Sequence, residues 1–189
     1  MWPWEHLAVG YLLLSVVVRA TYERPPGEAA VFVLLIGTQL PDLVDKPLAW
    51  EFGVFAGGQA LAHSAFVAVP VGVSGVLVGR SRGRTEAGLA LLVGYWSHLA
   101  ADVADPLRYG DGIEVERILW PFVETRPYSE DLGVARGLVY LREFVADLLA
   151  GGVSGPNLLY LLLPGIAFAL WIVDGLPGVA TLARAVRPR

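Results

Sequence analysis

The sequence predicts an all-α protein: a multi-helix integral membrane bundle of about five membrane helices, with one interfacial helix beside them. Hydrophobic residues make up 55% of the 189 residues and charged residues only 17%. Soluble domains carry roughly 25% charged residues. The mean hydropathy is +0.56, so the chain has too little charge to coat a globule in water. We expect a single membrane-embedded domain over residues 1–189.

Charge and cysteine content exclude several classes of function. The net charge of −4 argues against nucleic-acid binding by a basic surface, and we expect no nucleic-acid partner. The chain has no cysteine, which excludes disulfides, iron–sulfur clusters, thiolate zinc sites and cysteine nucleophiles. Any metal must therefore be held by histidine, carboxylate or backbone oxygen.

Five uncharged runs define the expected membrane helices, at residues 7–18, 29–41, 57–79, 87–101 and 148–173. A bilayer crossing needs about 20 mostly apolar residues. The third and fifth runs meet that length directly, whereas the fourth needs Asp102 and the first two need flanking residues. Pro3 suits the first turn of the first helix, and Pro41 is expected to end the second. Glycines in the third run are expected to allow close helix packing, at Gly72, Gly75 and Gly79.

The arginine distribution predicts the orientation of this bundle. If the five helices alternate across the membrane, one side receives eight basic and four acidic residues, and the other six and fourteen. Short arginine-rich loops stay in the cytoplasm. We therefore expect a multi-pass protein of the cell membrane, with the N-terminus outside, the C-terminus cytoplasmic and residues 105–156 extracytoplasmic. Within that segment, residues 131–150 predict either an interfacial helix on the membrane or a helix packed on the bundle ends.

The three histidines are the most informative residues, because each lies in apolar surroundings where an ionisable group is usually functional. His6 opens the first predicted helix, His63 lies one turn into the third and His98 lies near the end of the fourth. Asp42 and Asp45 follow the second. In the predicted topology all of these residues fall at the outer ends of their helices.

This set of side chains predicts a divalent metal site. His98 and Asp102 are four residues apart, so they share a helical face and can chelate one ion. Imidazole with carboxylate suits zinc first, with manganese or iron as alternatives, whereas magnesium favours oxygen alone. The predicted metal ligands are His6, Asp42, His63, His98 and Asp102. The structural alternative is a hydrogen-bonded polar network without an ion.

A series of short motifs resembles a known family: WEH at 4–6, LPDLVD at 40–45, HS at 63–64, GYWSHLAAD at 94–102 and LWPF at 119–122. This series, over about residues 1–125, is similar to the YdjM-like family. Its members are described as membrane-bound, metal-dependent hydrolases, some as LexA-binding and inner-membrane-associated. That family is distantly similar to the zinc-dependent phospholipase C group.

The phospholipase similarity implies that Asp42, His63, His98 and Asp102 form a first metal site and that His6 helps a second. Two departures limit it. Arg108 stands near the place of a further histidine, and no histidine follows His98 to make the later His-x-x-x-Glu pair. A three-metal cluster is therefore not expected. One ion remains, or two with carboxylate help from Asp45, Asp105 or Glu114.

Two classes of function follow. The first is an integral-membrane metal-dependent hydrolase that cleaves phosphoester or lipid-linked substrates with metal-activated water. Asp45 is the candidate general base, or a partner of a ligand, because it lies three residues after Asp42. Arg108 is a candidate phosphate contact or a salt-bridge partner of Asp105 or Asp111. The alternative is a non-catalytic metal-binding membrane scaffold or an ion carrier. In either class the expected partners include membrane lipids.

Overall fold

The computed structural model describes residues 1–151, 156–179 and 181, and these residues form six α-helices and no strand. The predicted all-α class is therefore confirmed. The helices are α1 (Pro3–Tyr22), α2 (Glu28–Trp50), α3 (Ala65–Ser81), α4 (Thr85–Ala104), α5 (Arg136–Gly151) and α6 (Pro156–Val173). A short 3-10 helix, η1 (Asp105–Tyr109), continues α4.

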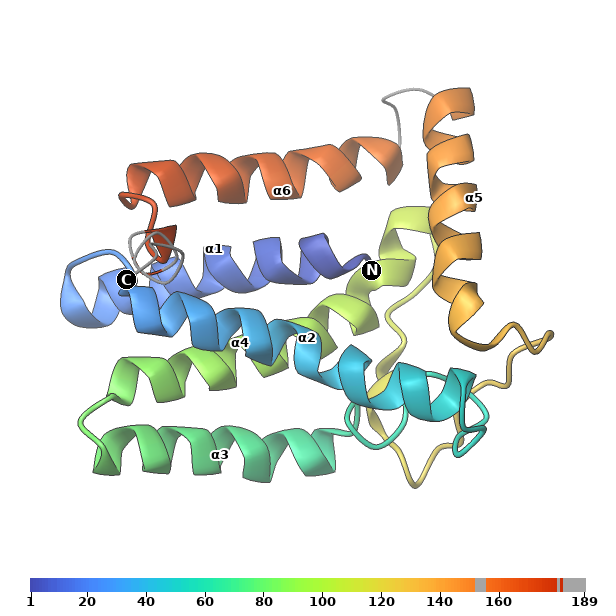
Figure 1. Cartoon of the computed structure of the whole chain (residues 1–189), viewed down its shortest axis with the longest axis horizontal. Helices are drawn as coiled ribbons and strands as arrows, with labels where there is room; N and C mark the ends of the chain where they lie inside the picture. The colour runs from blue at the N-terminus through green and yellow to red at the C-terminus, as the bar shows by residue number, and fades with distance from the viewer. Residues whose placement is uncertain (152–155, 180, 182–189) are drawn as a thin grey trace, which may run out of the picture.

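Five helices lie lengthwise beside one another and α5 crosses them at the end where the chain begins (Figure 1). Successive helices from α1 to α4 alternate in direction, so the start of α1, the end of α2, the start of α3 and the end of α4 meet at that end. Helix α4 is central, because it contacts α1, α2 and α3. This course brings Asp42, His63, His98 and Asp102 together at one end of the bundle.

Close backbone contact joins α3 to α4. A Cβ atom added to Gly88 would lie 2.5 Å from the Gly75 carbonyl oxygen, and one added to Gly79 would lie 2.8 Å from the Arg84 carbonyl oxygen. One added to Gly72 would lie 2.4 Å from the Leu92 side chain. The predicted packing role of Gly72, Gly75 and Gly79 is confirmed.

A buried carboxylate fastens α6 to α1 at the end of the bundle away from α5. Asp174 accepts hydrogen bonds from the Tyr11 hydroxyl at 2.7 Å and the Ser15 hydroxyl at 3.0 Å, and it pairs with Arg19. A buried carboxylate needs such partners, since each unmade hydrogen bond costs about 1–3 kcal/mol. The network fixes the end of α6 on a helix far from it in the sequence.

The third apolar run is not a single helix, and His63 does not lie within one. Residues 57–64 form a loop, and α3 begins at Ala65. The side chain of Ser64 caps α3 by accepting a hydrogen bond from the Phe66 amide at 3.2 Å. Backbone amides of the preceding loop donate hydrogen bonds to the carboxylate of Asp45, a contact that a hydropathy pattern does not reveal.

Pro41 does not end the second helix, because α2 continues through Pro41 and Pro47 to Trp50. Asp42 and Asp45 therefore lie inside α2 rather than after it. A proline within a helix removes one backbone hydrogen bond. Here Pro41 is buried, and packing of α2 along α4 outweighs the local preference. The fifth run divides between α5 and α6, and residues 152–155 lie outside the described part of the chain.

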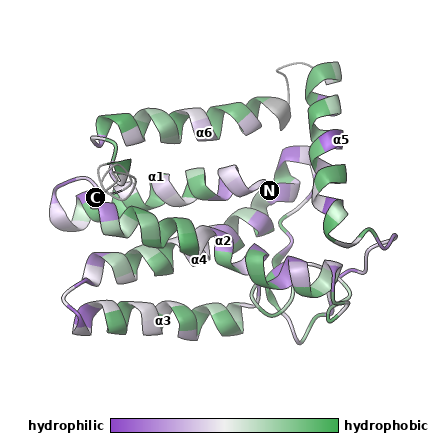
Figure 2. Cartoon of the chain, in the orientation of Figure 1, coloured by the Kyte–Doolittle hydropathy of each residue, from purple (hydrophilic) through white to green (hydrophobic). Residues whose placement is uncertain are grey.

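One helix in the described part of the chain is long and apolar enough to cross a membrane, the 25 residues Thr85–Tyr109 of α4 and η1. Two further apolar helices are shorter, at Ala65–Ser81 and Leu158–Val173. Figure 2 shows hydrophobic residues along most of α3 and α6 and hydrophilic residues in the turn between α3 and α4. The surfaces of α3 and α6 accordingly expose large apolar side chains, among them Val69, Val73, Leu77, Ile166 and Val173.

Helix α5 packs across the end of the bundle on one face and is exposed on the other. Phe144 contacts the Trp2 ring at a centroid distance of 5.0 Å, and Tyr140 contacts Trp50 at 6.4 Å. On the other face, Leu138 and Leu149 are 72% and 81% exposed. Of the two predictions for this helix, packing on the bundle end is therefore observed. This packing leaves an apolar face of α5 exposed.

The contact between α3 and α4 predicts opposite effects for two helical glycines. Gly88→Ala inserts a methyl group against backbone atoms of α3, so we expect a loss of about 1–3 kcal/mol in stability. Gly165→Ala in α6 meets no atom within 4 Å and should be neutral or stabilising by up to about 1 kcal/mol. Thermal unfolding in detergent measures both. Equal melting temperatures for the two variants would contradict the packing described here.

Candidate metal centre

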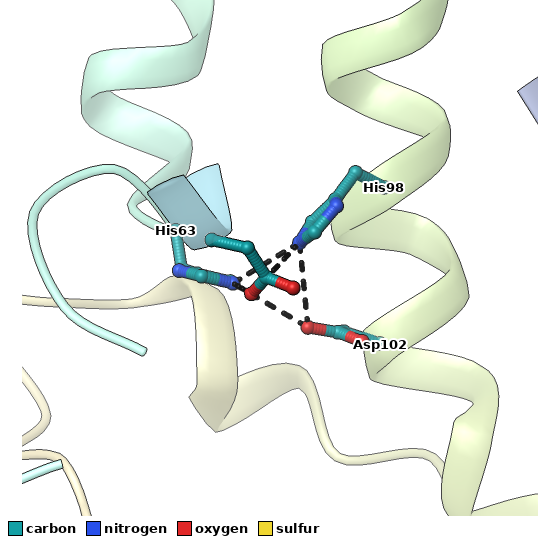
Figure 3. Close-up of side chains that lie close together, drawn as sticks. His63, His98 and Asp102 are labelled. Atoms are coloured by element: carbon teal, nitrogen blue, oxygen red, sulfur yellow. Dashed lines mark hydrogen bonds and ion pairs between the residues drawn. The ribbon is translucent and has the colours of Figure 1, made fainter. Parts of the chain in front are cut away.

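Four buried side chains from α2, the 57–64 loop and α4 meet at the end of the bundle that α5 crosses: Asp42, His63, His98 and Asp102. Each offers one nitrogen or oxygen atom, and these four atoms lie within 4.8 Å of one another. Figure 3 shows His63, His98 and Asp102 turned toward a common point. The group can bind a metal ion.

Five of the six separations between the donor atoms are close to those of a tetrahedral site. Nε2 of His63 lies 3.1 Å from Nε2 of His98, and 3.4 Å from both Oδ1 of Asp42 and Oδ2 of Asp102. Nε2 of His98 lies 3.7 Å from Oδ1 of Asp42 and 3.6 Å from Oδ2 of Asp102. Around an ion with bonds of about 2.0–2.1 Å, tetrahedral donors are about 3.3 Å apart. The imidazoles therefore lie near bonding positions relative to each carboxylate, and the two carboxylate oxygens, within 4.8 Å of each other, would close onto the ion.

Hydrogen bonds on the far side of each ring aim both imidazoles at this point. Nδ1 of His98 donates to the Thr38 carbonyl at 2.7 Å, and Nδ1 of His63 donates to Oδ2 of Asp45 at 2.8 Å. With Nδ1 protonated, the Nε2 atoms face each other with their lone pairs. Such an acceptor behind the ring is usual for metal-binding histidines. Two facing lone pairs need a cation between them, either a proton or a metal.

The two carboxylates are held from outside the cluster. Oδ1 of Asp42 is buried with no hydrogen-bond partner, while its Oδ2 accepts from Nζ of Lys46 at 2.5 Å. Oδ2 of Asp102 accepts from Nε2 of Gln59 at 2.9 Å. The unpartnered Asp42 oxygen is costly unless a ligand occupies it. The donor set therefore fits a divalent ion.

Comparison with known proteins assigns the chain. The model of the family described as "YdjM inner membrane protein" matches residues 1–176. The chain belongs to the YdjM family. The match includes all four residues of the cluster, as well as α1 to α6. Neither a curated protein nor a solved structure matches the chain.

Asp45 lies behind the cluster of this YdjM-family chain and is completely buried. Besides His63 Nδ1, it accepts hydrogen bonds from the backbone amides of Ala60, Ala62 and His63 at 2.8–3.0 Å. Both carboxylate oxygens are thus engaged. Asp45 fixes the 57–64 loop and the His63 ring at the same time.

The surrounding carboxylates favour positive charge at His63. Burial alone would lower the pKa of this imidazole, but the adjacent carboxylates of Asp102, Asp42 and Asp45 raise its pKa to about 10. The group of carboxylates attracts a proton to His63, and it would attract a metal cation for the same reason.

His6 lies beside the four-residue group and is not one of its members. Its ring stacks on His98 at a centroid distance of 3.7 Å, and its Nε2 lies 3.3 Å from Oδ1 of Asp102. Both nitrogens of His6 are buried without a hydrogen bond. Asp102 thus turns Oδ2 to the cluster and Oδ1 to His6 and to the Met1 ammonium, which lies 3.2 Å away. Among the described residues, no second group of three or more potential ligands contains His6.

The remaining predicted residues lie around the site. Arg108 pairs with Glu5 at 2.8 Å and with Asp105 at 3.0 Å, so the salt bridge to Asp105 is confirmed. Glu114 pairs with Arg117 at 2.6 Å, outside the cluster. Sequence reasoning missed the Thr38 carbonyl, Gln59 and Lys46. The sequence could have indicated Gln59, because it is a polar residue in an apolar run, and Lys46, because it lies four residues after Asp42. A backbone carbonyl cannot be identified from sequence.

The cluster predicts that a single carboxylate substitution removes metal. Asp102→Asn keeps the size of the side chain but removes the charge that offsets a dication, so zinc affinity should fall by more than about 100-fold, beyond the effect of indirect partners. Asp174→Asn is the matched control, a buried carboxylate at the far end of the bundle. It should lower the melting temperature and keep the metal. Elemental analysis and thermal unfolding on the same samples measure both effects, and equal metal content in Asp102→Asn and the wild type would refute a ligand role for Asp102.

Proposed function

We propose that this YdjM-family chain is an integral-membrane metal-dependent hydrolase that acts on phosphoester or lipid-linked substrates. The single observation that carries the proposal is the buried set of two imidazoles and two carboxylates whose four donor atoms lie within 4.8 Å of one another. Nitrogen and oxygen donors together favour zinc, with manganese or iron as alternatives.

Two cavities give access to this site. One, of about 540 Å³, is lined by Asp102, Gln59 and polar residues of the 123–128 segment. The other, of about 750 Å³, reaches Asp42 and is lined by aromatic residues of α2 and α5, among them Trp50 and Tyr140. Both volumes are in the range of small-molecule sites. A substrate can therefore reach a carboxylate of the cluster from a polar side and from an apolar side.

The protein's own residues would hold the reacting group in place. When bound, an ion of this kind supplies a water of lowered pKa and polarises a phosphoryl or carbonyl oxygen. Asp45 keeps the ring of His63 fixed, and the Thr38 carbonyl does the same for His98. Because both oxygens of Asp45 are engaged, we assign it the second of its two predicted roles, the partner of a ligand, rather than general base.

A second candidate function rests on the number of donors. Four protein ligands fill a tetrahedron, which is typical of structural zinc sites, whereas catalytic zinc keeps one position open. A non-catalytic metal-binding scaffold therefore remains the alternative. An ion carrier fits less well, because transporters place their ion sites near the membrane midplane and this cluster lies at one end of the bundle.

We also propose a multi-pass arrangement with the metal centre at the outer face. The family is an inner-membrane family, and the apolar surfaces of α3 and α6 suit contact with lipid. The exposed Arg80, Arg82 and Arg84 lie at the opposite end of the bundle from the cluster. By the positive-inside rule that end would be cytoplasmic, and the segment from residue 105 through α5 would be extracytoplasmic, with α5 at the membrane surface.

The hydrolase proposal predicts metal-dependent turnover of a simple phosphodiester, bis(p-nitrophenyl) phosphate. Zinc-loaded protein should hydrolyse it, and chelation or His98→Gln should abolish the activity. Asp45→Asn should weaken zinc binding by about 10–100-fold, as expected for the partner of a ligand, and should recover turnover at saturating zinc. Stoichiometric zinc without turnover on phosphodiesters or phospholipids would favour the scaffold instead.

The orientation predicts the behaviour of reporter fusions. A reporter fused after Arg84, in the α3–α4 turn, should behave as cytoplasmic, and one inserted at Gly112 should behave as extracytoplasmic, because these positions lie at opposite ends of the bundle. Phosphatase and fluorescent-protein fusions report the two sides. A cytoplasmic reading at Gly112 would place the metal centre at the inner face.

A further inference from the structure

Lys46 is the only lysine of the chain, and it stands at the edge of the cluster. It lies one turn after Asp42 on α2, and its Nζ donates to Oδ2 of Asp42 at 2.5 Å. Its ammonium lies 5.8 Å from the centre of the Trp50 ring. The side chain is 29% exposed, so its charged end is accessible, unlike the buried donors.

Lys46 lies on the wall that the two cavities share. It lines both the polar cavity that reaches Asp102 and the apolar cavity that reaches Asp42. The polar cavity includes Thr125 and Tyr128, and the apolar one includes Phe144 and Tyr160. The ammonium therefore marks the junction between a polar and an apolar compartment.

The other basic side chains near the site are engaged elsewhere. Arg117 and Arg126 pair with Glu114 at 2.6 and 3.3 Å, and Arg108 pairs with Glu5 and Asp105. Among the described residues, Met1 and Lys46 line both cavities. The Met1 ammonium pairs with Asp102 at 3.2 Å and Asp105 at 3.5 Å, so within that part of the chain Lys46 offers the one basic side chain at the junction. A lysine on a flexible stem can exchange its contact with Asp42 for one with an incoming anion.

We propose that the site takes an anionic amphiphile and that Lys46 binds its anionic group at the junction, with the apolar chain in the cavity between α2 and α5. This inference rests on the proposed hydrolase function and specifies its substrate class. Besides Asp42, which pairs with Lys46, the acidic residues of the apolar cavity are Asp105, Glu143 and Asp147, and their carboxylates repel an anion. They would keep the anionic group of the ligand near Lys46, so that the apolar chain of the ligand contacts the aromatic residues of the cavity.

Calorimetric binding to the zinc-loaded, detergent-solubilised full chain tests this, with octyl phosphate and inorganic phosphate as probes. The wild type should bind octyl phosphate more tightly than inorganic phosphate. Lys46→Met should weaken octyl phosphate binding by about tenfold, the effect of losing one charge-assisted hydrogen bond, and Lys46→Arg should restore most of it. Arg82→Met, which removes an exposed charge in the α3–α4 turn, is the matched control and should bind like the wild type.

A variant that fills the apolar cavity separates the contribution of the probe's alkyl chain to binding from that of its anionic group. A Cβ atom on Gly137 would lie 3.7 Å from the Trp50 ring, an ordinary contact, so Gly137→Leu should fill the apolar cavity, weaken octyl phosphate binding and leave inorganic phosphate binding unchanged. Equal affinity of the wild type for octyl phosphate and inorganic phosphate would contradict the proposal that the ligand is an amphiphile. A Lys46→Met variant that loses zinc but keeps its anion affinity would show that Lys46 only neutralises Asp42. Absence of zinc from the wild type would overturn the proposed metal centre, and this inference with it.

Discussion

Buried negative charge at one end of an apolar bundle is the constraint on which the rest of this structure depends. Asp42, Asp45 and Asp102 are each less than a tenth exposed, and three carboxylates this close need compensating positive charge and hydrogen bonds. The protein supplies backbone amides to Asp45, an ammonium to Asp42 and an amide donor to Asp102. The Asp42 oxygen that faces both imidazoles is left without a partner, and a divalent cation would complete it.

The same hydrogen bonds tie the site to the fold. Asp45 binds both the backbone of the loop before α3 and the His63 ring. The same carboxylate therefore fixes the conformation of that loop and the orientation of a metal donor. The Thr38 carbonyl does the same for His98 across α2 and α4. The centre is therefore built by contacts between elements that hydropathy alone treats as separate membrane spans, and a change in the packing of α2 on α4 moves the donor atoms.

Sequence reasoning recovered the features that depend on composition and spacing. Charge-poor runs indicated an all-α chain, and the rarity of His6, His63 and His98 in apolar segments indicated where the site lies. It failed where tertiary contacts override local preference. Pro41 does not end α2, because packing on α4 holds the helix. His63 lies in a loop, because its backbone amide and those of Ala60 and Ala62 bind a side chain fifteen or more residues away. Neither contact leaves a trace in hydrophobic periodicity.

X-ray absorption spectroscopy of the zinc-loaded protein tests the central claim most directly, because it reports the donors around the ion. The structure predicts two imidazole nitrogens, from His63 and His98, together with carboxylate oxygens from Asp42 and Asp102. All bonds should lie at about 2.0–2.2 Å, with outer-shell scattering from the two rings. A first shell of oxygen alone, without imidazole scattering, would contradict a metal centre built on the facing nitrogens of His63 and His98.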